Sequence, residues 1–247
     1  MDVSKNLKET MMARKPRYNL VGIPQHVIQR GNNREPCFYS QEDYAAYLEF
    51  AKIAADKVAC HLHAYVLMTN HVHMLITPWQ EQGIPAFMQS LGKRYVQYIN
   101  KTYQRTGTLW EGRYKASLVD SNGYMLSCMR YIELNPVRAN MVEVPSEYRW
   151  SSYGYNAVNM DNKNITPHPL YLELGVTEKE RCFVYRELFR DKIDNELLHD
   201  IRNSVNQDLV LGRDDFKDKI EGMINRTVRK GMPGRPCVKE AGSIYYY

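Results

Sequence analysis

Two strand-like runs, residues 61–68 and 71–77, are separated in this 247-residue chain by only two residues. So short a break predicts an antiparallel hairpin, because two-residue turns join neighbouring strands directly. Side chains along a strand alternate between the two faces of a sheet, so His71 and His73 point the same way. Val72 points into the opposite layer. The hairpin therefore predicts a sheet with a pair of imidazoles on one face, which could share a cation.

The two-residue turn also predicts the register of this hairpin. It pairs Met68 with His71, and it then places His61 and His63 on the face opposite His71 and His73. We therefore predict that the four histidines do not bind one metal ion, and that His61 and His63 are structural. A slip of one residue in the pairing would reverse these faces.

The segments around the hairpin alternate between strand-like and helical patterns. Ser40 is suited to cap a helix, with Asp43 in the acidic first turn, and Pro136 limits a later helix. The order of the elements predicts an α+β fold, an antiparallel sheet with helices packed on it, followed by a helical C-terminal extension. The spacing of apolar residues predicts helices at about 41–57, 84–103 and 121–134, and strands at 25–30 and 116–119.

Composition divides the chain into four parts. A polar stretch at residues 156–164 interrupts the alternating pattern, and the pattern after Thr166 is helical. A basic segment broken by Gly and Pro closes the chain. We expect a flexible leader at residues 1–13, the main domain at 14–155, a helical region at 156–225 and a basic flexible tail at 226–247.

The bulk composition excludes several classes of protein. The formal net charge of +5 is compatible with nucleic-acid binding without requiring it. The five cysteines are odd in number and scattered, which favours reduced thiols over a disulfide framework or a structural zinc site. There is no apolar run of about 18 residues and no apolar signal core, so we expect a cytoplasmic protein that does not span a membrane.

The helix that ends near residue 134 carries a second candidate group. Tyr131 and Asn135 are four residues apart, on one face of that helix. A tyrosine hydroxyl can attack phosphorus, and two histidines with an amide oxygen form half of a metal-binding shell. Each group also has a structural interpretation: half-buried histidines, a core tyrosine, and an asparagine that ends a helix before Pro136. The rival nucleophiles are Tyr95, Tyr98 and Tyr124.

Two segments together resemble a known family. Asn70-His71-Val72-His73 and Tyr131-Ile132-Glu133-Leu134-Asn135-Pro136-Val137-Arg138 are similar to the motifs of REP-associated tyrosine transposases, which are single-tyrosine HUH transposases. Similar blocks also occur at residues 25–33, 108–115 and 148–153. The resemblance covers about residues 14–155, which makes this segment the catalytic domain, and it continues more weakly into the helical C-terminal region.

The resemblance implies a ferredoxin-like or RRM-like HUH core. It implies a single-stranded DNA endonuclease and strand transferase that cuts near foldback, REP-like hairpins during DNA transposition. Tyr131 would be the nucleophile, forming a 5′-phosphotyrosine link and freeing a 3′ hydroxyl. His71, His73 and Asn135 would hold the divalent metal, Mg²⁺ or Mn²⁺. The alternatives are a domesticated protein of the same fold that binds hairpin DNA without cutting it, and a metal-dependent hydrolase that uses water.

The chain departs from the commonest family pattern at Glu133, where His is frequent, and at Asn140, where Gly is common. An acid at position 133 could weaken DNA contact locally. Basic and aromatic residues are candidates for DNA binding, because they can pair with phosphates and stack on bases. These candidates are Arg14, Lys15, Arg17, Arg30, Lys93, Arg94, Trp110, Arg113, Lys115, Arg138, Arg229 and Lys230. By resemblance, the protein is a monomer or a homodimer.

Overall fold

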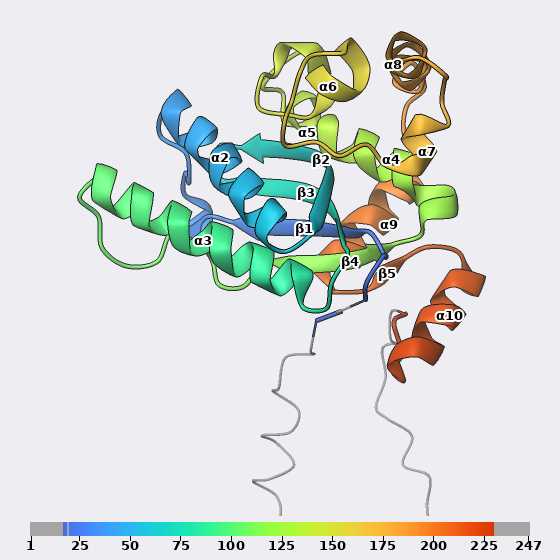
Figure 1. Cartoon of the computed structure of the whole chain (residues 1–247), viewed down its shortest axis with the longest axis horizontal. Coiled ribbons are helices and arrows are strands. Elements are labelled where there is room, and N and C mark those ends of the chain that lie inside the picture. Colours follow the sequence, from blue (N-terminus) through green and yellow to red (C-terminus); the bar gives the residue numbers. More distant parts are fainter. Residues whose placement is uncertain (1–16, 19, 230–247) are drawn as a thin grey trace, which may run out of the picture.

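Five strands form a single sheet in the order β2-β3-β1-β4-β5 in the computed structural model, which describes residues 17–18 and 20–229 (Figure 1). Neighbouring strands are antiparallel except β4 and β5, which are parallel. The predicted fold class is confirmed, and the short β5 makes the sheet mixed. The strands are β1 (Gln25–Arg30), β2 (Cys60–Met68), β3 (His71–Pro78), β4 (Lys115–Val119) and β5 (Val210–Leu211).

Helices cover both faces of this sheet. The larger helices are α2 (Gln41–Lys57), α3 (Gly83–Thr102), α4 (Ser121–Glu133), α8 (Glu178–Glu187), α9 (Asn195–Asn206) and α10 (Asp214–Ile224). The shorter ones are α5 (Asn135–Arg138), α6 (Tyr153–Val158), α7 (Pro169–Leu172) and the 3₁₀ turns η1 (Asn32–Arg34) and η2 (Pro145–Glu147). The order β1-α2-β2-β3-α3-β4 on four antiparallel strands is the ferredoxin-like arrangement.

The two faces of the sheet pack against different helices. α2 and α3 cover the face that carries Val27, Val72 and Met74, all of them buried in one apolar cluster. α4 and α9 cover the opposite face, where the apolar cluster includes Leu75 and Ile201. Because side chains alternate along β3, residues next to each other in the chain belong to different layers. None of the helices in the described part of the chain has the length and hydrophobicity to cross a bilayer.

The predicted cap of α2 is confirmed in detail. The Asp43 carboxylate accepts hydrogen bonds from the backbone N–H groups of Tyr39, at 2.7 Å, and Ser40, at 3.0 Å. It also accepts one from the Tyr103 hydroxyl at 2.9 Å, at the end of α3. This buried carboxylate therefore satisfies the two backbone N–H groups that lead into α2 and joins the two helices of this layer, a contribution of about 1 kcal/mol or more.

The hairpin register is confirmed at the turn and shifts farther along. Met68 pairs with His71 as predicted. A β-bulge between Leu62 and Ala64 leaves His63 as the extra residue, and beyond it His61 pairs with Thr77, on the same face as His71. The prediction that His61 and His63 lie on the opposite face is therefore wrong, because the bulge reverses the alternation.

Both histidines near the bulge have hydrogen-bond partners of their own. His63 bonds to the Thr77 hydroxyl at 2.9 Å and to the Thr166 carbonyl at 2.6 Å. His61 accepts a hydrogen bond from the Trp79 indole at 2.8 Å. Thr77 is four residues from His73, or about 13 Å along the strand. His61 and His63 therefore hold the distal end of the hairpin, away from His71 and His73.

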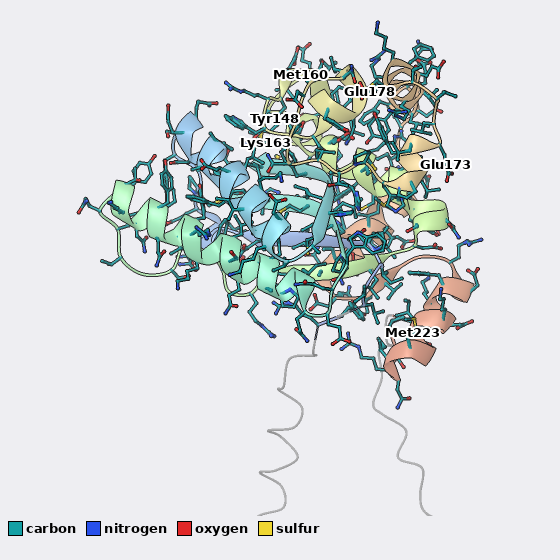
Figure 2. The ribbon with its side chains drawn as sticks, in the orientation of Figure 1. Tyr148, Met160, Lys163, Glu173, Glu178 and Met223 are labelled. Atoms are coloured by element: carbon teal, nitrogen blue, oxygen red, sulfur yellow. The ribbon has the colours of Figure 1, made fainter. Side chains whose placement is uncertain are left out.

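The chain beyond α5 covers the outer edge of β2. The backbone N–H of Leu67 donates to the Trp150 carbonyl at 2.9 Å, and that of Thr166 donates to the Leu62 carbonyl at 2.8 Å. The Tyr148 hydroxyl donates to the Leu67 carbonyl at 2.6 Å, on the same edge (Figure 2). These bonds occupy groups that an uncovered edge strand would offer to another chain.

The proposed division of the chain at residue 155 falls inside α6. Tyr153 and Ala157 of this helix are both buried in the apolar cluster that contains α4. The helical region that follows the division therefore shares a core with the sheet. The expected leader, 1–13, lies outside the described residues.

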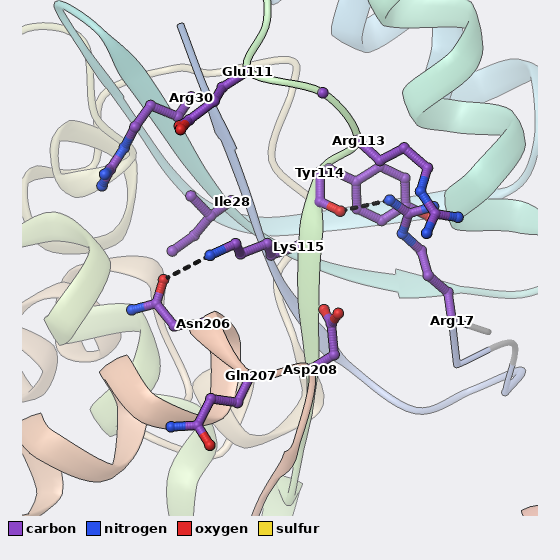
Figure 3. Close-up of a pocket in the computed structure, with 11 residues that line it drawn as sticks. Arg17, Ile28, Arg30, Glu111, Arg113, Tyr114, Lys115, Asn206, Gln207 and Asp208 are labelled. Atoms are coloured by element: carbon purple, nitrogen blue, oxygen red, sulfur yellow. Dashed lines mark hydrogen bonds between the residues drawn. The ribbon is translucent and has the colours of Figure 1, made fainter. Parts of the chain in front are cut away.

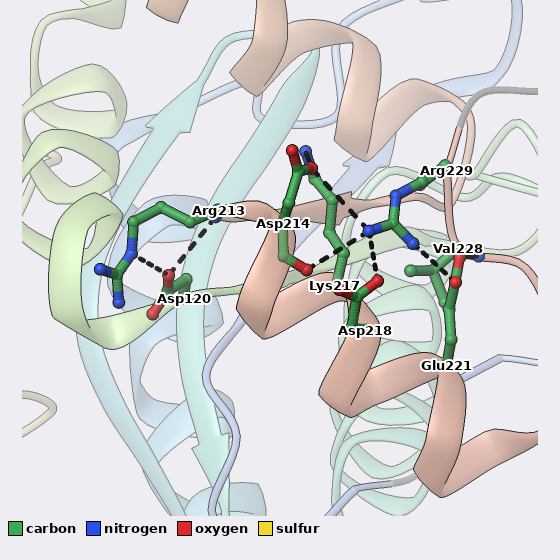
Figure 4. Close-up of polar contacts among 8 residues, drawn as sticks. All are labelled: Asp120, Arg213, Asp214, Lys217, Asp218, Glu221, Val228 and Arg229. Atoms are coloured by element: carbon green, nitrogen blue, oxygen red, sulfur yellow. Dashed lines mark hydrogen bonds and ion pairs between the residues drawn. The ribbon is translucent and has the colours of Figure 1, made fainter.

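The end of the described chain packs on α10. Val228 is fully buried with Tyr18 and Leu118. Arg229 forms ion pairs of 2.6 Å with both Asp218 and Glu221 (Figure 4). Residues 226–229, expected to begin a flexible tail, are therefore held by an apolar contact and by a charge network. The remainder of that tail, from Lys230, lies outside the described residues.

Candidate active site

One cavity of about 260 Å³ lies between the sheet and the C-terminal end of α4. β3 supplies His71 and His73 to its wall, the last turn of α4 supplies Tyr131, and α5 supplies Asn135. Strand alternation points the two imidazoles toward α4, and the packing of α4 across this face brings the phenol to them. The structure therefore gathers the four predicted metal and nucleophile residues around one space.

Hydrogen bonds orient both imidazoles. His71 Nδ1 lies 2.7 Å from the Asn70 side-chain oxygen, which can only accept, so Nδ1 carries the proton and Nε2 is left with a lone pair. His73 Nδ1 lies 2.9 Å from Nε2 of His26, a buried histidine on β1. Second partners of this kind usually hold metal-binding histidines in place. Asn70 and His26 therefore leave the Nε2 atoms of His71 and His73 as the candidate ligands.

Burial keeps these imidazoles uncharged. Desolvation lowers the pKa of His71 to about 4, with a smaller contribution from the Arg30 charge. Desolvation likewise lowers the pKa of His26 to about 3, and that of His73 well below its ordinary value. The neutral imidazole is the form that binds a metal ion.

Tyr131 is packed against the histidines and is only 4% exposed. Its ring centroid lies 6.0 Å from that of His73 and 5.7 Å from that of His26, edge-on in both cases. The Arg138 guanidinium lies over the Tyr131 ring, 4.0 Å from its centroid. Tyr131 thus packs as a core tyrosine does and also borders the cavity.

Asn135 combines the two roles that its position suggested. Its side-chain N–H group donates to the carbonyls of Tyr131, at 3.0 Å, and Ile132, at 3.1 Å, which caps the end of α4. Its oxygen accepts a hydrogen bond of 2.9 Å from Arg138. The capping bonds orient the amide at the cavity wall, and its oxygen, which has two lone pairs, can accept the Arg138 bond and still be offered to a ligand.

The donor set around the cavity fits a divalent cation. Two imidazole nitrogens and one amide oxygen suit Mn²⁺ and, with lower preference, Mg²⁺, and they leave coordination positions open for phosphate. No group of three His, Cys, Asp or Glu residues suited to a metal ion occurs in the part of the chain that is described. A metal in this region would therefore depend on His71, His73 and Asn135.

The rival tyrosines do not border this cavity. Tyr95 lies in the opposite layer, where its hydroxyl donates to the Cys37 carbonyl at 2.7 Å. Tyr98 is on α3 in that same layer. Tyr124, near the start of α4, is absent from the cavity wall. Among the tyrosines considered from sequence, only Tyr131 lies at the histidine pair.

A second cavity of about 490 Å³ adjoins the first, and the two share Ile28, Arg30 and Asn206 (Figure 3). Lys115 points across it and donates to Asn206 at 3.4 Å. Arg17 donates to the Tyr114 carbonyl at 2.7 Å and stacks on the Tyr114 ring. Four of the predicted DNA-binding residues therefore line this space: Arg17, Arg30, Arg113 and Lys115.

Other predicted DNA-binding residues lie elsewhere. Trp110 is 6% exposed and packs against Tyr47 and Tyr95, so its prediction as a base-stacking residue is wrong. Lys93 and Arg94 are exposed on α3, across the sheet from Tyr131. Arg229 is committed to its ion pairs on α10. Arg14, Lys15 and Lys230 lie outside the described residues.

The two departures from the family pattern have structural explanations. Glu133 is fully buried and accepts hydrogen bonds from Ser152, Asn156 and Tyr185, so it faces away from the cavity and the expected effect on DNA contact is wrong. Desolvation raises the pKa of Glu133 to about 7 against the effect of these donors. Asn140 has a φ of 53°, a left-handed conformation that suits Gly and that Asn tolerates best among the other residues.

Two residues of this site escaped the sequence analysis. His26 lies opposite Leu75 on β1, diagonal to His73, so the alternation of β1 would have revealed it once the pairing of β1 with β3 was known. Arg202 comes from α9, far along the chain, and also lines the cavity. No local pattern in the sequence signals its presence there.

Residues 20–135 match the family described as "Transposase IS200 like". The match extends from just before β1 to Asn135 and so includes the histidine pair, the tyrosine and the amide of the cavity. The class of protein that this match defines is therefore a transposase. Residues 20–135 belong to the IS200-like transposase family, and the resemblance to single-tyrosine transposases is confirmed.

One solved structure shares the fold of this chain, and others match part of it with lower scores. A REP-associated tyrosine transposase bound to a REP hairpin is 16% identical with a TM-score of 0.52, over 64% of this chain and 93% of that chain. A protein from Deinococcus radiodurans described as a transposase is 20% identical, with a TM-score of 0.35 over 49% and 96% of the two chains. A bacterial tRNA(His) guanylyltransferase-like protein in complex with GTP is 14% identical, with a TM-score of 0.35 over 56% and 77%. None of the curated proteins matches this chain.

Proposed function

We propose that this transposase cuts and rejoins single-stranded DNA beside a hairpin through a covalent link to Tyr131. The observation that carries the proposal is the cavity that these residues share, in which the centroids of the Tyr131 and His73 rings lie 6.0 Å apart. The Tyr131 oxygen attacks the phosphorus, the bond from phosphorus to the 3′ oxygen breaks, and a 3′ hydroxyl leaves. The proton lost by the phenol balances the proton gained by the 3′ oxygen. The resulting 5′-phosphotyrosine bond conserves the energy needed for rejoining.

His71, His73 and Asn135 would hold the divalent cation, Mg²⁺ or Mn²⁺, beside the phosphate. Such a cation polarises a non-bridging phosphate oxygen and offsets its charge. The chain's own residues fix the positions of these groups: Asn70 and His26 hold the imidazoles, and the capping bonds of Asn135 hold its amide at the cavity wall. Fixed placement of this kind accounts for much of the rate in phosphoryl transfer.

The DNA partner is proposed from charge and from the fold relative. The REP-associated tyrosine transposase of similar fold was solved with a REP hairpin. In this chain the cavity that adjoins Tyr131 is lined by four basic residues, Arg17, Arg30, Arg113 and Lys115, and by two acidic ones, Glu111 and Asp208, so the basic residues predominate and suit a run of phosphates. We propose that single-stranded DNA enters through this basic cavity and reaches Tyr131 past Arg30, which borders both spaces.

A covalent-adduct assay tests this function. Labelled hairpin oligonucleotides with a single-stranded flank are incubated with the full chain and Mn²⁺ or Mg²⁺, then denatured in SDS. We expect a labelled protein band with the wild type and none with Tyr131→Phe, although Tyr131→Phe should still bind the DNA. The matched controls are Tyr124→Phe, on the same helix, and Tyr95→Phe, in the opposite layer. Both should keep the adduct.

Three outcomes would contradict the proposal in different ways. Loss of the adduct in Tyr124→Phe but not in Tyr131→Phe would show that Tyr124, and not Tyr131, is the nucleophile. Cleavage without any adduct would indicate a water-dependent hydrolase. Hairpin binding without cleavage, with either metal, would indicate a DNA-binding protein that has kept only the fold.

A further inference from the structure

Three arginines surround the cavity at Tyr131. Arg30 comes from β1, Arg138 from α5 and Arg202 from α9. Neither Asp nor Glu is among the described residues that line this cavity. The three cations therefore face a space in which no carboxylate of the wall balances them, and such a space favours an anion.

The guanidinium of Arg138 is only partly satisfied. One of its terminal nitrogens donates to Asn135, whereas Nε and the other terminal nitrogen are buried without a hydrogen-bond acceptor. Desolvation lowers the pKa of Arg138, the adjacent Tyr131 phenol partly offsets this by raising it, and the nearby charge of Arg202 lowers it further. Buried donors without a partner are costly, typically 1–3 kcal/mol each, more for charged groups. These two nitrogens of Arg138 are thus available to a ligand with acceptor oxygens.

Arg202 is held near Arg138 by the packing of α9. The neighbouring residues Ile201 and Val205 are fully buried, and Asp194 caps the start of the helix at 2.9 Å. α9 therefore fixes the backbone of Arg202 beside the cavity, while the Arg202 side chain is exposed. Two like charges in one cavity repel each other, and an anion between them would remove the repulsion.

We propose that Arg138 and Arg202 form a clamp for the phosphate that Tyr131 attacks. The inference rests on the proposed function and extends it, because both arginines lie outside residues 20–135, the segment that matches the family. Arg138 is then a catalytic residue, since it touches both the nucleophile and the phosphate. A planar guanidinium can offer two parallel N–H groups to phosphate oxygens as charge builds on them.

The C-terminal region thereby gains a role in the chemistry. Arg202 reaches the cavity from α9, which begins more than seventy residues after the end of β4 in the chain. We expect the helical region to be required for cleavage itself as well as for the fold. Arg30, which lines both cavities, would guide the strand into the clamp.

Single-turnover cleavage of the hairpin oligonucleotides tests the clamp. We expect Arg138→Gln to slow cleavage by about 10²–10³-fold, the effect of losing one well-placed donor to the reacting oxygens. Arg138→Lys should recover only part of the rate, because lysine keeps the positive charge but lacks the two parallel N–H donors of the guanidinium. Arg202→Gln should slow cleavage about tenfold by removing one cation from the phosphate. The matched control is Arg190→Gln, an exposed arginine paired with Glu187, which should retain the wild-type rate.

A second measurement does not depend on cleavage. Inorganic phosphate, used as the probe, should raise the Tm of the wild type and of Arg190→Gln by binding the folded state. The double variant Arg138→Gln/Arg202→Gln should lose this shift. If Arg138→Gln fails to fold, Arg138→Lys and Arg202→Gln carry the same test.

The outcomes separate the clamp from the proposed function. Covalent adduct in the wild type, with normal rates in Arg138→Gln and Arg202→Gln, would overturn the clamp and leave the role of Tyr131 intact. Absence of adduct in the wild type would overturn the proposed function. In that case a phosphate shift lost in the double variant would still support the anion site, and an unchanged shift would overturn it.

Discussion

The two faces of the sheet are built from the same strands and serve different purposes. On β3, Val72 and Met74 enter the layer under α2 and α3, which is apolar and aromatic. His71 and His73 enter the layer under α4 and α9, which contains the cavity. Because side chains alternate along β3, a residue that packs the apolar layer and a residue that lines the cavity are direct neighbours in the chain.

Both faces of the sheet bury polar groups, but only the face under α4 borders the cavity at Tyr131. Under α2 and α3, the hydroxyl of Tyr95 and the carboxylate of Asp43 are bonded to backbone groups that need them. Under α4, Nδ1 of His26 and two nitrogens of Arg138 are buried without partners. The first face also buries unpartnered atoms, namely Asp43 Oδ1, the Tyr47 hydroxyl and the Trp110 indole N–H, so what distinguishes the second face is that its unpartnered Arg138 nitrogens belong to a residue lining the cavity at Tyr131. Substitutions on the two faces should therefore change different measured quantities.

The largest effect is expected from neighbouring substitutions on β3. His73→Ala should reduce metal-dependent cleavage by about 10³-fold or more, because it removes a metal ligand. Val72→Ala should leave the cleavage rate of the folded enzyme unchanged and lower the free energy of unfolding by about 2 kcal/mol. The pair is measured by single-turnover kinetics and by denaturant unfolding. Similar losses of activity in both variants would show that the faces are not independent.

Glu133 should give the chemical face a distinctive pH dependence. Its pKa in the folded state is raised to about 7 from 4.5, so the folded protein binds this proton more tightly than the unfolded one. The stability from Glu133 is therefore complete below pH 4.5 and is lost as the pH rises through about 7, a change of roughly 3 kcal/mol.

Comparison with Glu133→Gln isolates this contribution from other titrating groups. The difference in unfolding free energy, wild type minus Glu133→Gln, should fall as the pH rises from about 5 to about 8. It is measured by denaturant unfolding at each pH. A difference that stays constant over this range would show that Glu133 is ionised throughout.

His26 should act on cleavage through His73. His26→Leu fills the same space without a hydrogen bond to His73, so about 10–100-fold more metal should be needed for half-maximal cleavage. His26→Gln offers an acceptor again and should restore part of the affinity. The readout is cleavage as a function of Mn²⁺ concentration. Equal metal dependence in the wild type and His26→Leu would mean that His26 serves packing alone.

The smallest effect is expected at the cap of α2. Asp43→Ala should lower the free energy of unfolding by about 1–2 kcal/mol and leave cleavage unchanged, since the cap stabilises only the opposite layer. Asp43→Asn keeps an acceptor oxygen and should cost less. Asp56→Ala, which removes an exposed ion pair with Lys52, is the control and should change stability by less than about 1 kcal/mol. A large loss of cleavage in Asp43→Ala would contradict the separation of the faces.

Much of the molecule was predictable from local patterns. The turn after Met68, the cap at Ser40 and the spacing of apolar residues predicted the strands and helices of the core within a few residues. The motifs around His71 and Tyr131 identified the family, which the matching of residues 20–135 confirmed. These signals are readable because turns, caps and alternation depend on residues that are close together in the chain.

Tertiary structure decided the features that depend on distant partners. The bulge at His63 reversed the faces of His61 and His63, and burial removed Trp110 from the surface. The contact of His26 with His73 required the pairing of β1 with β3, and Arg202 reached the cavity only through the docking of α9. The sequence by itself determined which chemical groups were present and which local elements carry them. Which groups meet was decided by packing, because contacts between distant segments depend on how the whole chain buries its apolar surface.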